Sequence, residues 1–136
     1  MKTNTINHLP LEVLIIGNDR ILSIPYIEIK SIVCDKPYII LETITKRYHL
    51  SQNLTGFCTG LPPFILQCNK STYINLLQVT SIKKNTCGYE ACIDENSYHI
   101  ARRRIDEIKE NFIKFKTGLS HSGNCNNNCI DCKISV

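Results

Sequence analysis

Short apolar segments separated by turn residues fill most of this sequence, which is the pattern of a mainly β domain. Residues 12–16 form an apolar run that ends at Gly17-Asn18-Asp19, and residues 38–45 are rich in β-branched side chains. Residues 48–50 follow after Lys46-Arg47 and are expected to pair with 38–45 as a hairpin. The other predicted strands are 20–24, 27–34, 65–69, 73–75, 77–84, 89–94 and 97–100.

Two helices are predicted between and after these strands. A short one covers residues 52–59, with Ser51 as its expected N-cap, and Gly60-Leu61-Pro62-Pro63 ends it. The second opens near Ile105, because apolar residues recur there at helical spacing. Its apolar positions are Ile105, Ile108, Phe112 and Phe115.

The chain has 136 residues, which is the size of one domain. We expect a polar N-terminal tail at 1–10, a folded domain at 11–116 and a flexible tail rich in Ser, Gly and Asn at 117–136. No segment approaches the ~20 apolar residues of a membrane span, and the N-terminus lacks the apolar stretch of a signal peptide. A cytoplasmic protein without membrane insertion is therefore expected.

The eight cysteines divide into two groups. Without a signal peptide a disulfide scaffold is not expected, so the five cysteines in apolar segments are predicted to be small core residues. These are Cys34, Cys58, Cys68, Cys87 and Cys92. The other three follow a histidine in the pattern His-x3-Cys-x3-Cys-x2-Cys, which is a legitimate zinc set. For this set, His121, Cys125, Cys129 and Cys132, the prediction is an inert tail without a cofactor, and zinc binding or a redox contact are the alternatives.

No enzyme is expected. His49 with Cys58 or Cys68 could be posed as a nucleophile pair, but Cys68 falls in a core-facing register and no oxyanion hole is evident. The carboxylates are dispersed, with no pair placed for acid–base catalysis.

Polar residues gather where the strand at 65–69 turns into the strand at 73–75. Two amides, an ammonium and two hydroxyls at one strand end suit contact with phosphates and base edges. They belong to Gln67, Asn69, Lys70, Ser71 and Thr72. The alternative is a polar turn between two strands.

Three consecutive arginines, Arg102, Arg103 and Arg104, stand at the start of the last predicted helix. Cations there oppose the helix dipole at a cost of about 0.3–1 kcal/mol each, and Ala101 is a poor N-cap. Guanidinium groups beside free helix N–H groups fit a DNA phosphate or a guanine edge. The alternative is a solvated turn that Asp106 and Glu107 partly neutralise.

Taken together over residues 12–115, these landmarks resemble the LytTR family of bacterial DNA-binding domains, which are output domains of response regulators. The match lies in the order and separation of the motifs. They are Ile24-Pro25-Tyr26-Ile27-Glu28-Ile29, the segment 32–38, Leu61-Pro62, the signature at 66–75 and Ile100-Ala101-Arg102-Arg103-Arg104.

The resemblance implies a fold of small β-sheets with a short central helix and a C-terminal helix. It also implies that loops at the sheet edges enter successive major grooves of duplex DNA. Carried onto this sequence, the base-reading positions are Lys36 and Tyr38, Asn69 to Thr72, and Arg102 to Arg104. Gln67 and Asn69 stand where the family signature has Arg and His, and amides pair with adenine, so an A·T-leaning site is predicted.

The resemblance predicts a transcription regulator in which the DNA-binding domain stands alone, because a receiver domain does not fit before Glu12. The signal is then expected from a partner protein, from the oligomeric state, with a homodimer on direct or inverted repeats, or from the tail. Two alternatives remain open. One is a protein–protein interaction module that kept the fold and lost base reading, and the other is a metal or redox sensor that acts through the tail.

Overall fold

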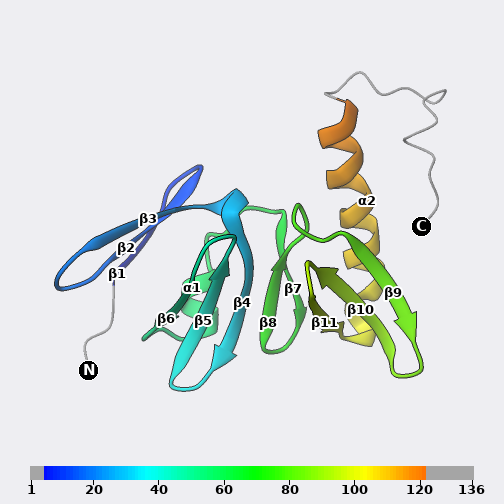
Figure 1. The fold of residues 1–136 in the computed structure, drawn as a ribbon, viewed down its shortest axis with the longest axis horizontal. Coiled ribbons are helices and arrows are strands. Elements are labelled where there is room, and N and C mark those ends of the chain that lie inside the picture. The colour runs from blue at the N-terminus through cyan, green and yellow to red at the C-terminus, as the bar shows by residue number, and fades with distance from the viewer. Residues whose placement is uncertain (1–4, 122–136) are drawn as a thin grey trace.

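The computed structural model describes residues 5–121 and contains three antiparallel sheets with two α-helices (Figure 1). The mainly β architecture predicted from the sequence is confirmed. None of the helices within the described residues is long and apolar enough to cross a membrane.

The N-terminal sheet has three strands in the order β1-β2-β3. They are β1 (Thr5–His8), β2 (Glu12–Ile16) and β3 (Ile21–Pro25). The expected tail over residues 1–10 is therefore wrong for its second half, since β1 pairs with β2 from Thr5 opposite Ile16 to His8 opposite Val13. His8 explains why a polar segment is held there, because its ring nitrogens lie 2.8 Å from the Tyr26 hydroxyl and 2.7 Å from the Phe57 carbonyl oxygen.

The central sheet has five strands in the order β6-β5-β4-β8-β7. Its strands are β4 (Ile29–Asp35), β5 (Tyr38–Thr43), β6 (Arg47–Leu50), β7 (Ile65–Asn69) and β8 (Thr72–Asn75). The predicted hairpin between β5 and β6 is confirmed. The predicted strand over 27–34 begins two residues late, because the 3₁₀ turn η1 (Tyr26–Glu28) follows Pro25 and buries the Tyr26 ring.

The central helix α1 (Leu54–Cys58) is shorter than predicted, and Ser51 is not its cap. Asn53 has extended backbone angles, and its Oδ1 accepts from the Gly56 amide at 2.6 Å. The Gln52 amide donates to the Leu50 carbonyl oxygen, so residues 50–52 form a turn before the helix opens. The capping residue is of the predicted type, two positions later.

The third sheet has the order β11-β10-β9 and packs on the C-terminal helix. Its strands are β9 (Ser81–Asn85), β10 (Gly88–Ile93) and β11 (Asn96–Ile100). The strand predicted at 77–84 begins only at Ser81. Asn75 interrupts it, because its side-chain Oδ1 accepts from the Leu77 amide and its carbonyl oxygen accepts from the Gln78 amide.

The 3₁₀ turn η2 (Arg102–Arg104) leads into α2 (Ile105–His121). The predicted apolar face is confirmed, since Ile108 and Phe112 are buried and Ile105 and Phe115 pack against them. The tail predicted from Thr117 begins too early, because α2 continues to His121. Cys125, Cys129 and Cys132 lie outside the described residues.

Two core clusters hold the sheets together. The first joins the N-terminal sheet, the central sheet and α1, with Phe57 fully buried at its centre. The second joins the β7–β8 hairpin, the third sheet and α2. Of the cysteines predicted as core residues, Cys58 and Cys68 are buried, but Cys34 and Cys92 are only half-buried and Cys87 is exposed.

Candidate nucleic-acid interface

Three turns lie along the lower edge of the molecule as drawn in Figure 1. The first joins β4 to β5 at Lys36-Pro37, the second joins β7 to β8 at Lys70-Ser71, and the third is η2 at the start of α2. We call these three segments the turn edge. The sequence separates them by more than thirty positions each, and the antiparallel order of the strands brings them to one side.

The first two turns of the turn edge border a common hollow of about 1450 Å³. The loop before α1 closes its other side. Five of the predicted contact residues line this hollow, namely Lys36, Tyr38, Gln67, Lys70 and Ser71. The Lys36 and Lys70 side chains are exposed, so two cations stand at the rim of a concave surface. The structure thus places residues from two predicted contact segments around one hollow.

Asn69 holds the β7–β8 turn in place. Its Nδ2 donates to the His99 carbonyl oxygen at 2.7 Å, and its Oδ1 accepts from the amide and the hydroxyl of Ser71, each at 3.0 Å. The Ser71 carbonyl oxygen in turn accepts from the Cys34 amide at 2.8 Å. These bonds fasten the turn to β11 on one side and to β4 on the other. They leave Lys70 at the exposed tip, whereas Thr72 is buried with 6% exposure.

The three arginines of η2 differ in their surroundings. Arg102 and Arg103 are exposed, and within residues 5–121 neither makes an ion pair. Arg104 is turned inward, and its Nη2 donates to Gln67 Oε1 at 3.0 Å. Its Nε is buried with no hydrogen-bond partner in the described part of the chain, and Glu107 Oε1 lies 4.0 Å from Nη1. Arg104 therefore joins η2 to β7, and the two exposed arginines face outward.

The start of α2 has two exposed arginines and no side-chain cap. Ala101 has extended backbone angles and offers no side-chain cap, and its amide donates to the Cys68 carbonyl oxygen at 2.8 Å. Asp106 and Glu107 occupy the first turn of α2 and favour its dipole. Neither is within ion-pair distance of Arg102 or Arg103. The arginines stay exposed despite these nearby carboxylates.

The geometry speaks against the nucleophile pair considered from the sequence. Burial raises the pKa of the Cys58 and Cys68 thiols to about 12, so both stay protonated near neutral pH. His49 is exposed on β6, and Cys68 is fully buried on β7. Among the described residues no group of three or more His, Cys, Asp or Glu is placed to hold a metal.

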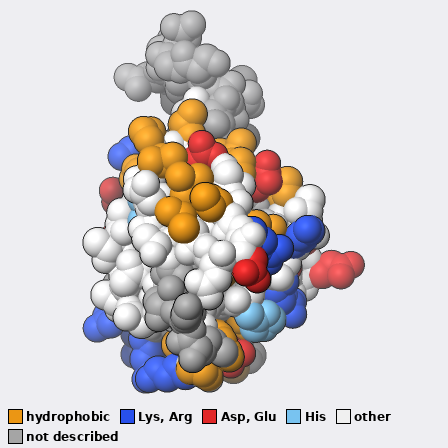
Figure 2. Space-filling view, turned by 90° about the vertical axis from the view of Figure 1, so that its left-hand side faces the viewer, with side chains coloured by type: hydrophobic (Ala, Val, Ile, Leu, Met, Phe, Trp, Pro, Cys, Tyr) orange, Lys and Arg blue, Asp and Glu red, His pale blue; other side chains and the backbone are white. Residues whose placement is uncertain are grey.

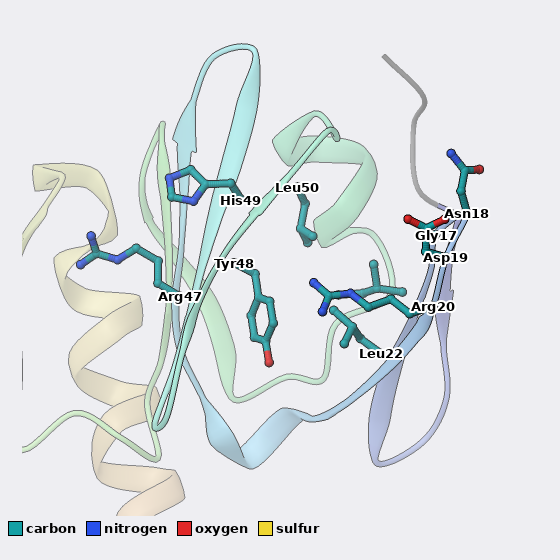
Figure 3. A pocket seen from close by; sticks show the side chains of 10 residues that line it. Gly17, Asn18, Asp19, Arg20, Leu22, Arg47, Tyr48, His49 and Leu50 are labelled. Carbon is teal, nitrogen blue, oxygen red and sulfur yellow. The ribbon is translucent and has the colours of Figure 1, made fainter.

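A second, smaller hollow of about 360 Å³ lies between the β2–β3 turn and β6. In Figure 3, Arg20 extends across it toward Tyr48, whereas Arg47 and His49 point to the opposite side of β6. Arg47 is paired there with Glu42 at 2.9 Å. This hollow contains none of the predicted contact residues and is separate from the turn edge.

The sequence model of the LytTr DNA-binding domain matches residues 19–113. The chain belongs to the LytTR family. The family consists of DNA-binding domains found in transcription regulators of two-component systems, and it is not an enzyme family. The resemblance inferred from the sequence motifs is therefore confirmed.

A solved structure agrees with the LytTR fold. The chain is similar to the LytTr DNA-binding domain of a protein described as a methyl-accepting/DNA response regulator from Bacillus cereus. The TM-score is 0.62 at 12% identity, over 74% of this chain and 95% of that one. The search of curated proteins gives no match. At this identity the likeness supports the fold and assigns no residue a role.

Proposed function

We propose that this LytTR chain is a transcriptional regulator that binds duplex DNA sequence-specifically, with its turn edge in the major groove. The main supporting observation is that three turns, each with at least one exposed Lys or Arg and remote from one another in sequence, lie on one side of the molecule (Figure 1). Their exposed cations are Lys36, Lys70, Arg102 and Arg103. Contacts of lysine and arginine with phosphates supply most of the affinity of such an interface, and contacts with base edges supply its specificity.

The proposal divides the predicted contact residues by what their side chains already do. We assign Arg102 and Arg103, which are exposed and form no ion pair within residues 5–121, to a guanine edge or a phosphate, and exposed Lys36 and Lys70 to phosphates of the DNA backbone. The side-chain carbonyl oxygen of Gln67 accepts a hydrogen bond from Arg104, and that of Asn69 accepts one from Ser71. A bidentate contact of an amide with adenine needs this side-chain oxygen as an acceptor. We therefore assign these two amides to the support of the turn edge. The A·T-leaning site stays a prediction that the selection below can test.

The opposite end of the molecule is apolar. Leu11, Ile27 and Ile44 are exposed there by 81%, 60% and 49%. Backbone hydrogen bonds from Tyr26 to Leu11 and from Ile44 to Glu28 bring their segments together. Figure 2 shows a group of hydrophobic side chains in the upper part of this face, whereas most of its Lys and Arg side chains lie lower, where some hydrophobic side chains also occur. This separation supports DNA contact at the turn edge and leaves the apolar end clear of it.

A second candidate function is a protein–protein interaction module that no longer reads bases. The apolar end and the internal bonding of Gln67 and Asn69 favour it. The two candidates differ in one experiment, which is the selection of duplexes from a random library by the purified chain. Enrichment of a defined sequence, with binding that weakens as salt rises, supports the regulator. Recovery of no sequence would reject it in favour of the module.

A further inference from the structure

The tip of the β9–β10 hairpin is cationic and exposed. Lys83, Lys84, Asn85 and Thr86 are all exposed, and Cys87 closes the turn. Figure 1 places this tip at the same lower end as the turn edge, beside the start of α2. The carboxylates of the β10–β11 turn, Asp94 and Glu95, lie at the other end of the hairpin.

The hairpin is held in a defined place relative to η2. Lys84 stands opposite Tyr89, and Tyr89 stands opposite Ile100, one residue before Ala101 and η2. Lys109 of α2 lies over the Tyr89 ring, with its Nζ 4.2 Å from the centroid, and Lys84 Nζ lies 5.9 Å from the same centroid. The ring also packs against the second core cluster. Tyr89 therefore links the hairpin, β11 and α2 at the level of the arginines.

The spacing of these strands matches the dimensions of a DNA groove. Two strand separations, each about 4.8 Å, place the backbone of Lys84 roughly 10 Å from that of Ile100. The major groove of B-DNA is about 12 Å wide between its bordering phosphates. The hairpin tip therefore lies within about one groove width of η2.

The positive charge of the hairpin tip is only partly neutralised by neighbouring side chains. Glu90 stands opposite both Lys83 and His99 on the outer face of the sheet, but no ion pair forms between Glu90 and Lys83 in the described part of the chain. Lys84 lies on the other face, beside the Tyr89 ring. Two exposed ammonium groups that form no ion pair within residues 5–121 suit phosphates, which are bound by charge, and do not suit the fixed donor pattern of a base.

We propose that the β9–β10 hairpin is a fourth DNA-contacting segment, in which Lys83 and Lys84 bind backbone phosphates beside the groove that η2 enters. This inference rests on the proposed DNA-binding function and adds a segment that neither the family motifs nor the three turns include. The hairpin extends the contact along the duplex and raises affinity for all sequences alike. It contributes no base preference of its own.

The test compares two charge-matched double variants of the full chain. K83Q/K84Q removes the hairpin cations. The control, K46Q/K114Q, removes two exposed lysines, one in the β5–β6 turn at the opposite end of the central sheet and one in the second half of α2. Affinity is measured over a range of salt concentrations on a duplex selected from the random library and on an unselected duplex.

The slope of log K against log salt is negative, and each lost phosphate contact reduces its magnitude by about 0.9. K83Q/K84Q should therefore reduce the magnitude of the slope by about 1.8 on both duplexes. The control should leave the slope unchanged, and both variants should select the same sequence as the unaltered chain. A slope for K83Q/K84Q equal to that of the control would overturn the proposal. A changed selected sequence would overturn the assignment to phosphates.

Two further arms keep the outcomes separate. If the unaltered chain binds no duplex, the proposed function fails before the hairpin is examined. If K83Q/K84Q melts below the control, the single variant K83Q, which leaves the Lys84–Tyr89 contact in place, should lower the slope by about 0.9. An unchanged slope in that variant also overturns the proposal.

Discussion

Arg104 and Gln67 are joined by a hydrogen bond of 3.0 Å between Nη2 and Oε1, across 37 positions of sequence. This bond connects the start of α2 to β7, and so connects two segments of the turn edge. Gln67 stands where the family signature has an arginine. In this chain the residue on β7 accepts a hydrogen bond from a guanidinium of η2.

Exchanging the two residues tests this relationship. Gln67→Arg places a second guanidinium beside Arg104 and removes its acceptor, and it should lower the free energy of unfolding by about 1–3 kcal/mol. The double variant Gln67→Arg/Arg104→Gln restores a donor and an acceptor and should recover most of that loss. Urea unfolding measures all four proteins. If the two single effects simply add in the double variant, the residues are not coupled as the structure indicates.

Arg103 is the arginine of η2 that we expect to read a base. Arg103→Ala should weaken binding to the selected duplex by about 1–3 kcal/mol and relax the preference at one position of the site. Arg103 is exposed and makes no ion pair within residues 5–121, so the melting temperature of the variant should stay unchanged. Fluorescence anisotropy with single-base variants of the duplex measures both the affinity and the base preference. Equal loss on every sequence would mean that Arg103 meets only phosphate.

Lys70 offers the contrasting case at the tip of the β7–β8 turn. Lys70→Ala should weaken binding to all sequences alike and reduce the magnitude of the slope of log K against log salt by about one unit. Its ammonium is a flexible point charge and carries no fixed donor fork, which is why we assign it to phosphate. Titrations at several salt concentrations measure the slope. No change in slope together with unchanged affinity would remove the β7–β8 turn from the interface.

The sequence predicted most of this fold, because its evidence was local. Strand periodicity located β2, β5, β7 and β10, and the spacing of Ile108 and Phe112 located α2. What failed depended on tertiary partners. The hydrogen bonds of His8 to Tyr26 and Phe57 order a polar N-terminal segment, and no local pattern announces them. The predicted cap at Ser51 was wrong because Ser51 and Asn53 are both suitable N-cap residues and lie two positions apart. The backbone angles, which the sequence does not show, make Asn53 the cap.

The candidate site was predictable as a set of residue types and not as an arrangement. Lysines and arginines in turns were visible in the sequence, but their convergence depends on the strand order β4-β8-β7. The roles of Gln67 and Asn69 were not predictable either, since their partners Arg104 and His99 are thirty or more positions away. The lysines of β9 are two adjacent cations before a turn and belong to none of the family motifs.

Variants of Asn69 test whether its side chain supports the β7–β8 turn or reads a DNA base. Asn69→Ala removes the bonds to His99 and Ser71 and should lower the free energy of unfolding by about 1–3 kcal/mol. DNA affinity should fall because the β7–β8 turn loses its fixed position, while the selected sequence stays the same. Asn69→Asp keeps the acceptor for Ser71 and should be less destabilised. A changed base preference in the alanine variant, with stability retained, would show that the amide reads DNA.

Truncation of the C-terminal segment distinguishes a structural role of the end of α2 from a metal site in the residues after it. Truncation after His121 should leave the melting temperature and the DNA affinity of the full chain, because residues 122–136 include few apolar residues to offset their ordering entropy. Truncation after Phe115 should lower the melting temperature, since it removes the bond from Lys116 Nζ to the Leu77 carbonyl oxygen at 2.9 Å. A strong chelator should change neither the full chain nor the longer truncation. Stoichiometric zinc in the full chain, or an affinity that chelation lowers only there, would instead assign His121, Cys125, Cys129 and Cys132 to a metal site, because thiolate ligation couples metal binding to folding.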